Sequence, residues 1–353
     1  MKIGIDARMY GTGTGGIGRY IQKLIENLEK IDQQNEYVIF LRQENWSEYI
    51  PTASNFRKVL ADIRWYGWRE QILLPRILKR EKLDLLHFPH WNVPIFYHGR
   101  FVVTIHDLLL RRYPTKEAST LGPISYFFKN LAYRFVSAYA ARHAEKIFTV
   151  SQASARDIEN YFHASKEKIQ VTYLAHSMEA GISKEAARQY VGDKFGLGGE
   201  FGIYVGAAFP HKNLERLIRI WPKVVEKIPQ ATLVLAGKEN YFYKKIKQII
   251  AAEGLNRIIY INFPTDEDIR HLLSAARLFI MPSLFEGFGM PPLDALACGV
   301  PVVSSNTTSL PEVLGESALY FNPEDENDML DKIVRGWTDE NVRFEILRNA
   351  PAE

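Results

Sequence analysis

Two carboxylates, Glu286 and Asp294, stand eight positions apart in a segment suited to a ligand that carries both hydroxyls and phosphates. An apolar run ends just before Glu286, and two prolines then lead into an expected helix with Asp294 in its first turn. Carboxylates accept hydrogen bonds from sugar hydroxyls, and glycine-bearing loops expose main-chain N–H groups to phosphate oxygens. The segment therefore predicts a sugar-phosphate or nucleotide site, although an acid in a first helical turn is also explained by the helix dipole.

A second candidate phosphate site is the glycine-rich segment Gly11–Tyr20, which contains Gly15 and Gly16. Glycines let a backbone approach a phosphate closely, and the helix expected next presents unpaired N–H groups. The pattern G-x-G-x-x-G occurs there in two overlapping registers, so an NAD-dependent dehydrogenase is an alternative. However, Asp6–Tyr10 separate the first expected strand from the first glycine, and the second strand is followed only by Glu44 as an acidic ribose partner.

Several further polar or aromatic residues directly follow expected strands, where the ligands of parallel sheets bind. A histidine in such a place is often structural, and a tryptophan often seals the edge of a core. These candidates are His90, Trp91, His106, Asp107, His211 and Lys212.

The triplet Asp266-Glu267-Asp268 matches the acid-x-acid pattern of manganese sites, but it follows Pro264-Thr265 at an expected helix start. Capping and compensation of the helix dipole explain it without an ion. We therefore expect no metal and no other cofactor.

Short apolar runs alternate with amphipathic stretches along the whole sequence, which is typical of parallel sheets built from βαβ units. The polar, glycine-bearing region from about residue 176 to 200 separates the expected strands into two groups of five. The prediction is an α/β protein with two Rossmann-like domains, residues 1–175 and 176–353, facing a central cleft. The expected strands are 2–6, 36–41, 84–87, 101–105, 146–150, 202–206, 231–236, 258–262, 278–281 and 301–303, and the clearest helices are 17–30, 127–144, 214–227 and 266–276.

Composition excludes several classes of protein. The 44 Lys and Arg against 41 Asp and Glu give a net charge of +3, too small to indicate a nucleic acid partner. The single cysteine, Cys298, excludes a disulfide scaffold, and the sequence starts without a signal peptide, so we expect a cytoplasmic protein. Residues 64–82 mix aromatic and basic side chains, which suits peripheral contact with an anionic membrane, although a solvated basic helix is an equally plain explanation.

Four motifs together resemble the retaining glycosyltransferases of family four, which have the GT-B architecture. They are the segment Glu286–Val303, Gly15–Tyr20, Thr104–Asp107 and Pro210–Asn213, and they occur in the family's order over residues 1 to about 325. The resemblance implies transfer of a hexose, first of all mannose from GDP-mannose, to a glycan or lipid-linked acceptor. A nucleotide-sugar-binding protein without turnover is an alternative.

The resemblance also implies roles for individual residues. Glu286 would lie beside the donor sugar, Lys212 would neutralise the diphosphate, and His106 would contact the sugar near the reacting carbon. Asp294 would hold the ribose, and Gly15 and Gly16 would approach the diphosphate from the first domain. The remaining donor contacts would come from His211 and from the loop Gly287, Phe288, Gly289 and Met290, and the acceptor side would contain His90, Trp91 and Asp107.

Three features depart from the family pattern. Asp294 stands where glutamate is usual, so the ribose must sit closer or be reached through water. His211 stands where arginine is common, so diphosphate binding depends more on Lys212. Family members usually continue into a long helix that returns to the first domain, whereas this sequence stops at Glu353, which predicts a truncated chain.

Overall fold

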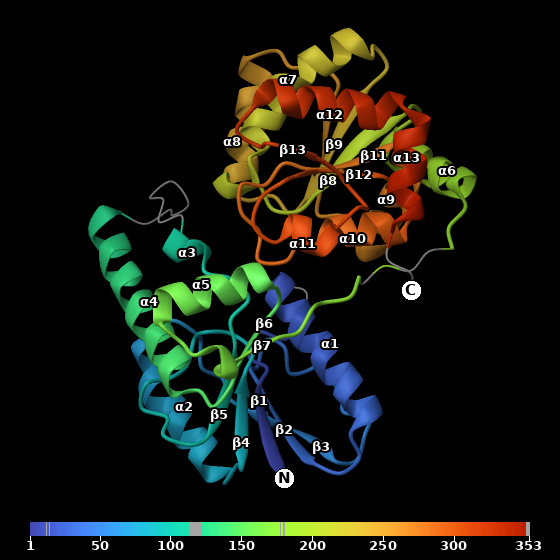
Figure 1. Cartoon of the computed structure of the whole chain (residues 1–353). Coiled ribbons are helices and arrows are strands. Elements are labelled where there is room, and N and C mark those ends of the chain that lie inside the picture. Colours follow the sequence, from blue (N-terminus) through green and yellow to red (C-terminus); the bar gives the residue numbers. More distant parts are fainter. Residues whose placement is uncertain (12, 14, 113–121, 177, 179–180, 351–353) are drawn as a thin grey trace. The chain divides into compact units, whose positions relative to one another are not determined.

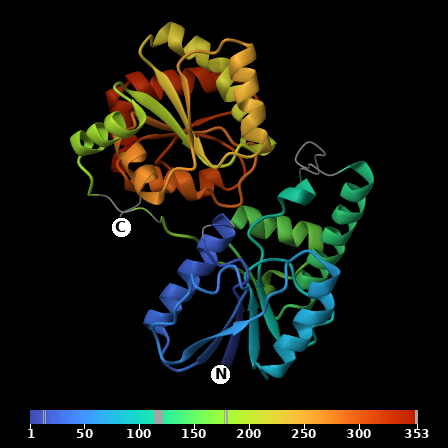
Figure 2. The same cartoon turned by 180° about the vertical axis from the view of Figure 1, so that it is seen from behind.

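The computed structural model describes residues 1–11, 13, 15–112, 122–176, 178 and 181–350. The chain forms two compact units, the first reaching to Thr172 and the second beginning at Tyr173. Each unit is built on its own parallel β-sheet, as Figures 1 and 2 show from opposite sides. The predicted pair of Rossmann-like α/β domains is confirmed at the level of fold class.

The first unit contains a seven-stranded parallel sheet in the order β3-β2-β1-β4-β5-β6-β7. The change of direction at β1 places α1 on one face of this sheet and α2 and α4 on the other. The strands are β1 Lys2–Asp6, β2 Glu36–Leu41, β3 Phe56–Leu60, β4 Leu85–Phe88, β5 Phe101–Thr104, β6 Ile147–Thr149 and β7 Ile169–Val171. The helices are α1 Gly16–Ile31, α2 Trp68–Arg80, α3 Leu109–Arg112, α4 Pro123–His143, α5 Gln152–Phe162 and the 3₁₀ turn η3 Lys166–Lys168.

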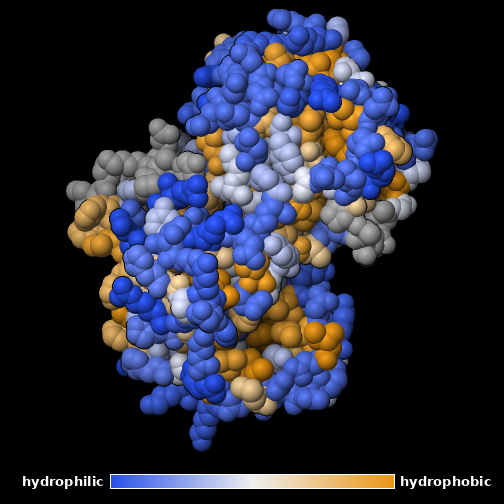
Figure 3. Space-filling view, viewed as in Figure 1, coloured by the Kyte–Doolittle hydropathy of each residue, from blue (hydrophilic) through white to orange (hydrophobic). Residues whose placement is uncertain are grey.

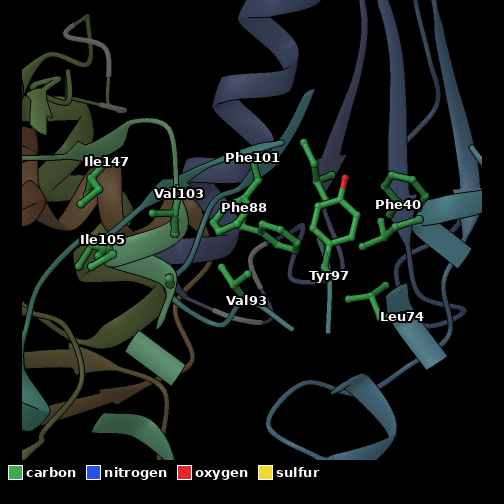
Figure 4. Packing of buried hydrophobic residues seen from close by; sticks show 14 of the residues in the cluster. Phe40, Leu74, Phe88, Val93, Tyr97, Phe101, Val103, Ile105 and Ile147 are labelled. Carbon is green, nitrogen blue, oxygen red and sulfur yellow. The ribbon is translucent and has the colours of Figure 1, made fainter. Parts of the chain in front are cut away.

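Two apolar clusters, one on each face, hold this sheet between its helices. On the face of α2 and α4, side chains from neighbouring strands pack against the helices, and Figure 4 shows Phe88, Tyr97 and Phe101 turned toward one another. Phe88 and Phe101 meet edge to face with ring centroids 5.6 Å apart. This packing fixes where the strands end, and therefore where the residues that follow them lie.

The second unit contains a six-stranded parallel sheet in the order β10-β9-β8-β11-β12-β13. Its strands are β8 Phe201–Val205, β9 Thr232–Gly237, β10 Ile258–Asn262, β11 Leu278–Met281, β12 Val302–Ser305 and β13 Leu319–Phe321. Its helices are α6 Lys184–Phe195, η4 Pro210–Lys212 (a 3₁₀ turn), α7 Leu214–Lys227, α8 Tyr241–Ala252, α9 Asp266–Ala275, α10 Met290–Ala297, α11 Leu310–Leu314, α12 Glu326–Thr338 and α13 Glu340–Arg348.

The two central strands of the second unit, β8 and β11, are hydrogen-bonded neighbours. Parallel neighbours end at the same edge of a sheet, so the loops that follow them meet there. These are the loops that carry Lys212 and Glu286. In the part of the chain that the structure describes, no helix combines the length and the apolar character required to cross a bilayer.

Candidate functional site

Lys212 and Glu286 form an ion pair at the carboxyl edge of the second sheet. The Lys212 ammonium nitrogen lies 2.7 and 2.8 Å from the two Glu286 carboxylate oxygens, and both side chains are largely buried. An ammonium has three N–H donors, and the two carboxylate contacts account for two of them. The pair therefore places a cation and an anion side by side, where a phosphate and a sugar could be bound together.

The turn that carries Lys212 is anchored by the residue after it. Asn213 adopts the left-handed conformation, with φ of 59°, and thereby ends η4. Its side-chain amide donates to the carbonyl oxygens of Pro282 and Pro323, at 3.1 and 3.0 Å. The main-chain N–H of Leu284 also donates to the His211 carbonyl at 2.7 Å. The loops after β8 and β11 are thus held directly to each other.

The loop that carries Glu286 is held by hydroxyls from the loop between β12 and α11. The Glu286 main-chain N–H donates to Thr308 Oγ1 at 3.0 Å. Ser309 Oγ lies 3.0 Å from both the Glu286 and the Phe288 carbonyl oxygens, to which its O–H can donate. Such support fixes the carboxylate before any ligand arrives, which is what a preorganised electrostatic site requires.

Helix α10 begins at Met290 directly after Gly289, whose φ of 99° is one that L side chains rarely adopt. A Cβ atom built on Gly289 would lie 2.6 Å from Leu310 Cδ2, so only glycine fits this turn. The next two residues, Pro291 and Pro292, have no N–H groups. Of the predicted main-chain donors, Phe288 and Gly289 therefore precede the helix, and Met290 is its first residue.

Asp294 is the fifth residue of α10, so its predicted place in the first turn is wrong, because the helix begins at Met290. Its carboxylate is buried, and its Oδ1 accepts a hydrogen bond from the Met178 main-chain N–H at 3.2 Å. Support of the helix terminus is consequently a weak explanation for this acid, since the dipole acts mainly within the first turn. Asp294 thus lies in the helix into which the loop at 286–290 leads.

His211 contributes little positive charge beside Lys212. Its ring stacks on Phe209, with centroids 5.8 Å apart and the planes 11° from parallel. Burial, together with the neighbouring Lys212 charge, lowers the pKa of His211 to about 4, against an opposing effect of Glu286. The imidazole is therefore neutral near pH 7, and Lys212 carries the cationic charge of this turn.

In the first unit, the glycine-rich segment leads into α1 through Gly15, the residue that caps the helix with φ of 73°. Gly16 is the first helical residue, and a Cβ on either glycine would have no heavy atom within 4 Å. A long loop separates Asp6, at the end of β1, from this helix, and Glu44 is paired with Arg42. The long loop contradicts the NAD-binding alternative, which needs a tight turn directly after the strand.

His106, two residues beyond β5, is a neutral imidazole with a defined tautomer. Its Nε2 lies 3.0 Å from the Pro89 carbonyl oxygen, and because a carbonyl can only accept, Nε2 carries the proton and Nδ1 is the acceptor nitrogen. Burial lowers the pKa of His106 to about 4. The ring meets Tyr20 of α1 edge to face at 4.7 Å. A neutral His106 can accept a hydrogen bond from a sugar hydroxyl but cannot act as an imidazolium near pH 7.

His90 and Trp91 lie in an aromatic cluster, here called the Trp91 cluster, that also contains Tyr66 and Tyr133. Tyr66 stacks on Trp91 at 5.3 Å, Tyr133 meets it edge to face at 4.6 Å, and the Tyr66 hydroxyl lies 2.8 Å from His90 Nε2. Trp91 is half-buried against the core, whereas Tyr66 is 49% exposed. Tyr66 is therefore the ring that the cluster presents to a ligand, and it was not among the predicted acceptor residues.

A buried ionic network supports the Trp91 cluster from beneath. Arg8 donates to Asp6 at 2.7 Å and to Glu70 at 2.6 Å, and Glu70 also accepts from Asn92 and from the Tyr66 main-chain N–H. Burial opposes the charge on Arg8, but Asp6 and Glu70 raise its pKa above the ordinary value.

The last predicted acceptor residue, Asp107, accepts a hydrogen bond from the Leu109 main-chain N–H at 3.0 Å, at the start of α3.

Acidification is expected to destabilise the first unit through its buried histidines. Burial lowers the pKa of His87 and His106 to about 4 and that of His90 to about 3. An unfolded chain binds these protons near pH 6.5, so the stabilisation is complete above pH 6.5 and is lost as the pH falls toward 4. Urea unfolding should give a smaller free energy of unfolding at pH 5.0 than at pH 7.5. His87→Gln should reduce this difference between the two pH values, whereas replacement of the exposed His143 should leave it unchanged. An equal loss of unfolding free energy between pH 7.5 and 5.0 in the His87 variant would contradict this account.

The acid triplet at 266–268 starts a helix, as the capping explanation predicts. Thr265 Oγ1 accepts from the Asp268 main-chain N–H at 3.1 Å, and the Asp268 carboxylate accepts from the Thr265 N–H at 3.0 Å. Asp268 is further bound by Lys194 and Tyr190. Among the described residues, no group of three or more His, Cys, Asp or Glu side chains has the arrangement of a metal site.

Comparison with known proteins gives the same two-part division. Residues 14–175 match the family model described as Glycosyltransferase Family 4, and residues 194–352 match that of Glycosyl transferases group 1. The chain is 30% identical to O-antigen chain mannosyltransferase B of Escherichia coli, with 93% of this chain and 88% of the relative covered.

Solved structures share the fold at low sequence identity. Sucrose-phosphate synthase of Thermosynechococcus elongatus superimposes with a TM-score of 0.78 at 17% identity, covering 99% of this chain and 93% of that one. Anabaena HepE, solved in complex with UDP and glucose, gives a TM-score of 0.73 at 20% identity with the same coverage. Together with the full-length bacterial relative and both family models, these matches show that the chain belongs to the family-four glycosyltransferases, enzymes of the GT-B fold.

Proposed function

We propose that this glycosyltransferase transfers a hexose, in the first instance mannose from GDP-mannose, with retention of configuration to a glycan or lipid-linked acceptor. The observation that carries the proposal is the Lys212–Glu286 pair beside the start of α10. The full-length relative of Escherichia coli is named an O-antigen chain mannosyltransferase, which favours mannose and a polysaccharide acceptor. HepE, a structural neighbour of this chain, was solved with UDP and glucose, so UDP-sugars are the competing donors.

Breaking the bond between the anomeric carbon and the phosphate leaves negative charge on the diphosphate and positive charge on the sugar. In the proposal, Lys212 and the main-chain N–H groups near Phe288, Gly289 and Met290 stabilise the diphosphate, with Gly15 and Gly16 approaching it. Glu286 stabilises the developing positive charge, and Gly287 keeps the loop beside it free of a side chain. The neutral His106 accepts a hydrogen bond from a donor-sugar hydroxyl at Nδ1, and His211 packs beside the leaving group without adding charge.

For Asp294 we propose the ribose hydroxyls as partners. The carboxylate already accepts one hydrogen bond from the Met178 N–H through Oδ1. A carboxylate has about four lone-pair sites, so it can hold this main-chain segment and a ribose hydroxyl together. These two contacts give a physical reason for aspartate in place of glutamate, because the carboxylate must stay close to the Met178 main chain.

A thermal shift panel tests the proposed donor. GDP, UDP, ADP and their sugars, and NAD as a negative probe, should be offered to the full chain, because stabilisation grows with the logarithm of ligand concentration over its dissociation constant. We expect stabilisation by one nucleoside diphosphate, GDP first, and slow nucleotide release from its sugar. Specific binding without any release would favour the alternative of a binding protein without turnover. The same assay in EDTA tests the expected independence of metal, and strict manganese dependence would overturn it.

On the acceptor side we propose a sugar subsite formed by His90, Trp91, Asp107 and the exposed ring of Tyr66. Tyr66 has a left-handed backbone, with φ of 62°, which is costly for a residue other than glycine and is common at functional sites. Glu70 holds it in place through the main-chain N–H at 2.9 Å. The ring is thus fixed in orientation before a sugar stacks on it.

Removing the Tyr66 ring should weaken binding of the acceptor and leave hydrolysis of the donor unchanged. Tyr66→Ala is expected to raise the KM for a mannose-terminated lipid-linked oligosaccharide by about tenfold, the usual worth of one aromatic stacking contact, with donor hydrolysis unchanged. Phe344→Ala, which removes a ring exposed to 64% in the second unit, is the matched control. An unchanged acceptor KM in the Tyr66 variant would place the acceptor elsewhere.

A cytoplasmic location and a peripheral contact with an anionic membrane remain predictions from the sequence.

A further inference from the structure

The second unit contains a groove with a volume of about 480 Å³ that the proposed chemistry does not use. It is lined by the loop after β8, the first turns of α7 and α8, and Glu326 of α12. Its buried apolar lining includes Leu214, Phe242 and Ile246. Sites for small molecules commonly have volumes of about 300–1,000 Å³, so the groove has room for a ligand. We call it the α7–α8 groove.

Three aromatic residues of the groove form one group. Phe242 is buried and contacts both Phe209 and Tyr241, with ring centroids 5.3 Å apart in each pair. Phe209 is 39% exposed and Tyr241 is 62% exposed. An exposed aromatic face can stack on the apolar face of a sugar ring. The group therefore presents two exposed rings, supported by a buried third, to a ligand in the groove.

The charged residues of the groove carry both signs and already contact polar groups. The Arg219 guanidinium lies 3.1 Å from the Glu215 carboxylate, and the Lys245 ammonium lies 3.6 Å from the same carboxylate. Arg216 donates to the Pro323 carbonyl oxygen. The surface over α7 and α12 is mostly hydrophilic, as Figure 3 shows. Because ion pairs between exposed side chains contribute little to stability, the hydroxyls of a ligand can replace part of these contacts at little cost.

This mixture of charges favours a neutral ligand with many hydroxyls. An anion would meet Glu215 and Glu326, and a cation would meet Arg216, Arg219 and Lys245. A hydroxyl can donate to a carboxylate and can accept from a guanidinium or an ammonium group. A hexose also has an apolar face that can stack on the exposed rings. An apolar peptide, by contrast, would remove water from the charged side chains and offer no hydrogen bonds in return.

The α7–α8 groove adjoins the turn that carries Lys212. Phe209 of the groove stacks on His211, which directly precedes Lys212 in the chain. Asn213, which anchors this turn, also lines the groove. Neither Lys212 nor Glu286 is a lining residue, so a sugar in the groove would not take the place of the donor. The groove is thus a separate site beside the proposed donor site.

We propose that the α7–α8 groove binds neutral hexose units of the glycan acceptor, at a distance from the hexose that reacts. The proposal rests on the proposed transfer to a glycan, and it assigns a second contact to that substrate. A second contact along one chain raises the effective concentration of the chain at the enzyme, provided that the chain can span both sites. Long glycan acceptors should therefore bind more tightly than short ones.

Binding of free sugars without a donor tests the groove directly. The probes are mannotriose and the trisaccharides of glucose and of galactose, titrated calorimetrically into the full chain. The titrations use the Tyr66→Ala variant, so that the proposed acceptor subsite contributes little. We expect weak binding of at least one trisaccharide, and about tenfold weaker binding when Tyr241→Ala is added. Adding Phe344→Ala instead, which removes a ring exposed to 64% on α13, is the matched control and should leave binding unchanged.

Three results of these titrations would overturn the proposal. They are the absence of binding by every trisaccharide, equal binding with and without the Tyr241 ring, and displacement of the sugar by GDP or by inorganic diphosphate. The last result would assign the sugar to the donor site. Because no donor sugar and no turnover are involved, an error in the proposed GDP-mannose donor would not change these results.

The length of the acceptor provides a second test. Tyr241→Ala should raise the KM for a long polysaccharide acceptor about tenfold relative to the KM for a lipid-linked disaccharide. Tyr66→Ala should raise both KM values, because its ring is proposed to bind the reacting end. An equal change of both KM values in the Tyr241 variant would contradict a role that depends on chain length. A fall in kcat with both acceptors would show that Tyr241 supports the turn of Lys212, and would also overturn the proposal.

Discussion

Replacement of Lys212 by methionine is expected to lower kcat/KM for the nucleotide sugar by about a thousandfold, the effect of losing a charged donor at a leaving group. The ammonium is the cationic group of its turn, because the adjacent His211 is neutral near pH 7. Methionine keeps the length of the stem, so the turn anchored by Asn213 should persist. Initial rates over a range of donor concentration measure the effect, and both a lower kcat and a higher KM are expected.

The matched control for this variant is Lys227→Met, which removes an exposed lysine at the far end of α7. It should leave both constants unchanged. If Lys212→Met retained full kcat and raised only KM, the ammonium would bind the ground state and the transition state equally. The proposed stabilisation of the leaving diphosphate would then be wrong.

Replacement of Glu286 by glutamine should lower kcat by about a hundredfold and change donor KM little. The amide keeps the shape of the carboxyl group and can still accept one hydrogen bond from Lys212, which lies 2.7 Å from Oε1. It removes the negative charge that faces the developing positive charge on the sugar. Single-turnover rates with saturating donor isolate this effect from binding. The matched control is Glu226→Gln, which neutralises an exposed carboxylate of α7 outside the site and should leave the rate unchanged.

The Glu286 variant also separates two retaining mechanisms. In attack from the same face as the departing diphosphate, a diphosphate oxygen takes the acceptor proton and Glu286 forms no bond to the sugar. We therefore expect residual transfer with the configuration retained in the variant, and no covalent species in the natural chain. A glycosyl adduct on Glu286, found by mass spectrometry with a slow fluorinated donor, would contradict this and make the carboxylate a nucleophile.

Much of the architecture was predictable because apolar strands can be recognised in the sequence as apolar runs between amphipathic helical stretches. All ten expected strands are present, with ends that differ by no more than two residues. Three strands were missed, for two physical reasons. In β3, Arg57 and Lys58 interrupt the apolar pattern, and the side chain of Arg57 pairs with Glu36 and Glu81. The strands β7 and β13 are three-residue strands at the edges of their sheets, and they lack the longer apolar run that indicated the equally short β6.

The site was less predictable, because its contacts join residues far apart in the sequence. Lys212 and Glu286 were both candidates, but their pairing depends on β8 and β11 being neighbours in the sheet, 74 residues apart at the contact. Likewise, Thr308 supports the Glu286 loop and Met178 binds Asp294, and no local motif marks either one. Tyr66 was overlooked because its value lies in a strained backbone and in stacking on Trp91, neither of which leaves a mark in residue order.

A crystal structure of the full chain with a slow, fluorinated form of the donor chosen by the thermal shift panel would decide the matter. The expected result is a diphosphate within hydrogen-bond distance of Lys212 Nζ, a hexose against Glu286 and a ribose at Asp294. A well-ordered nucleotide bound away from residues 286–290 would refute the assignment of this ion pair as the place where the glycosidic phosphate bond is broken.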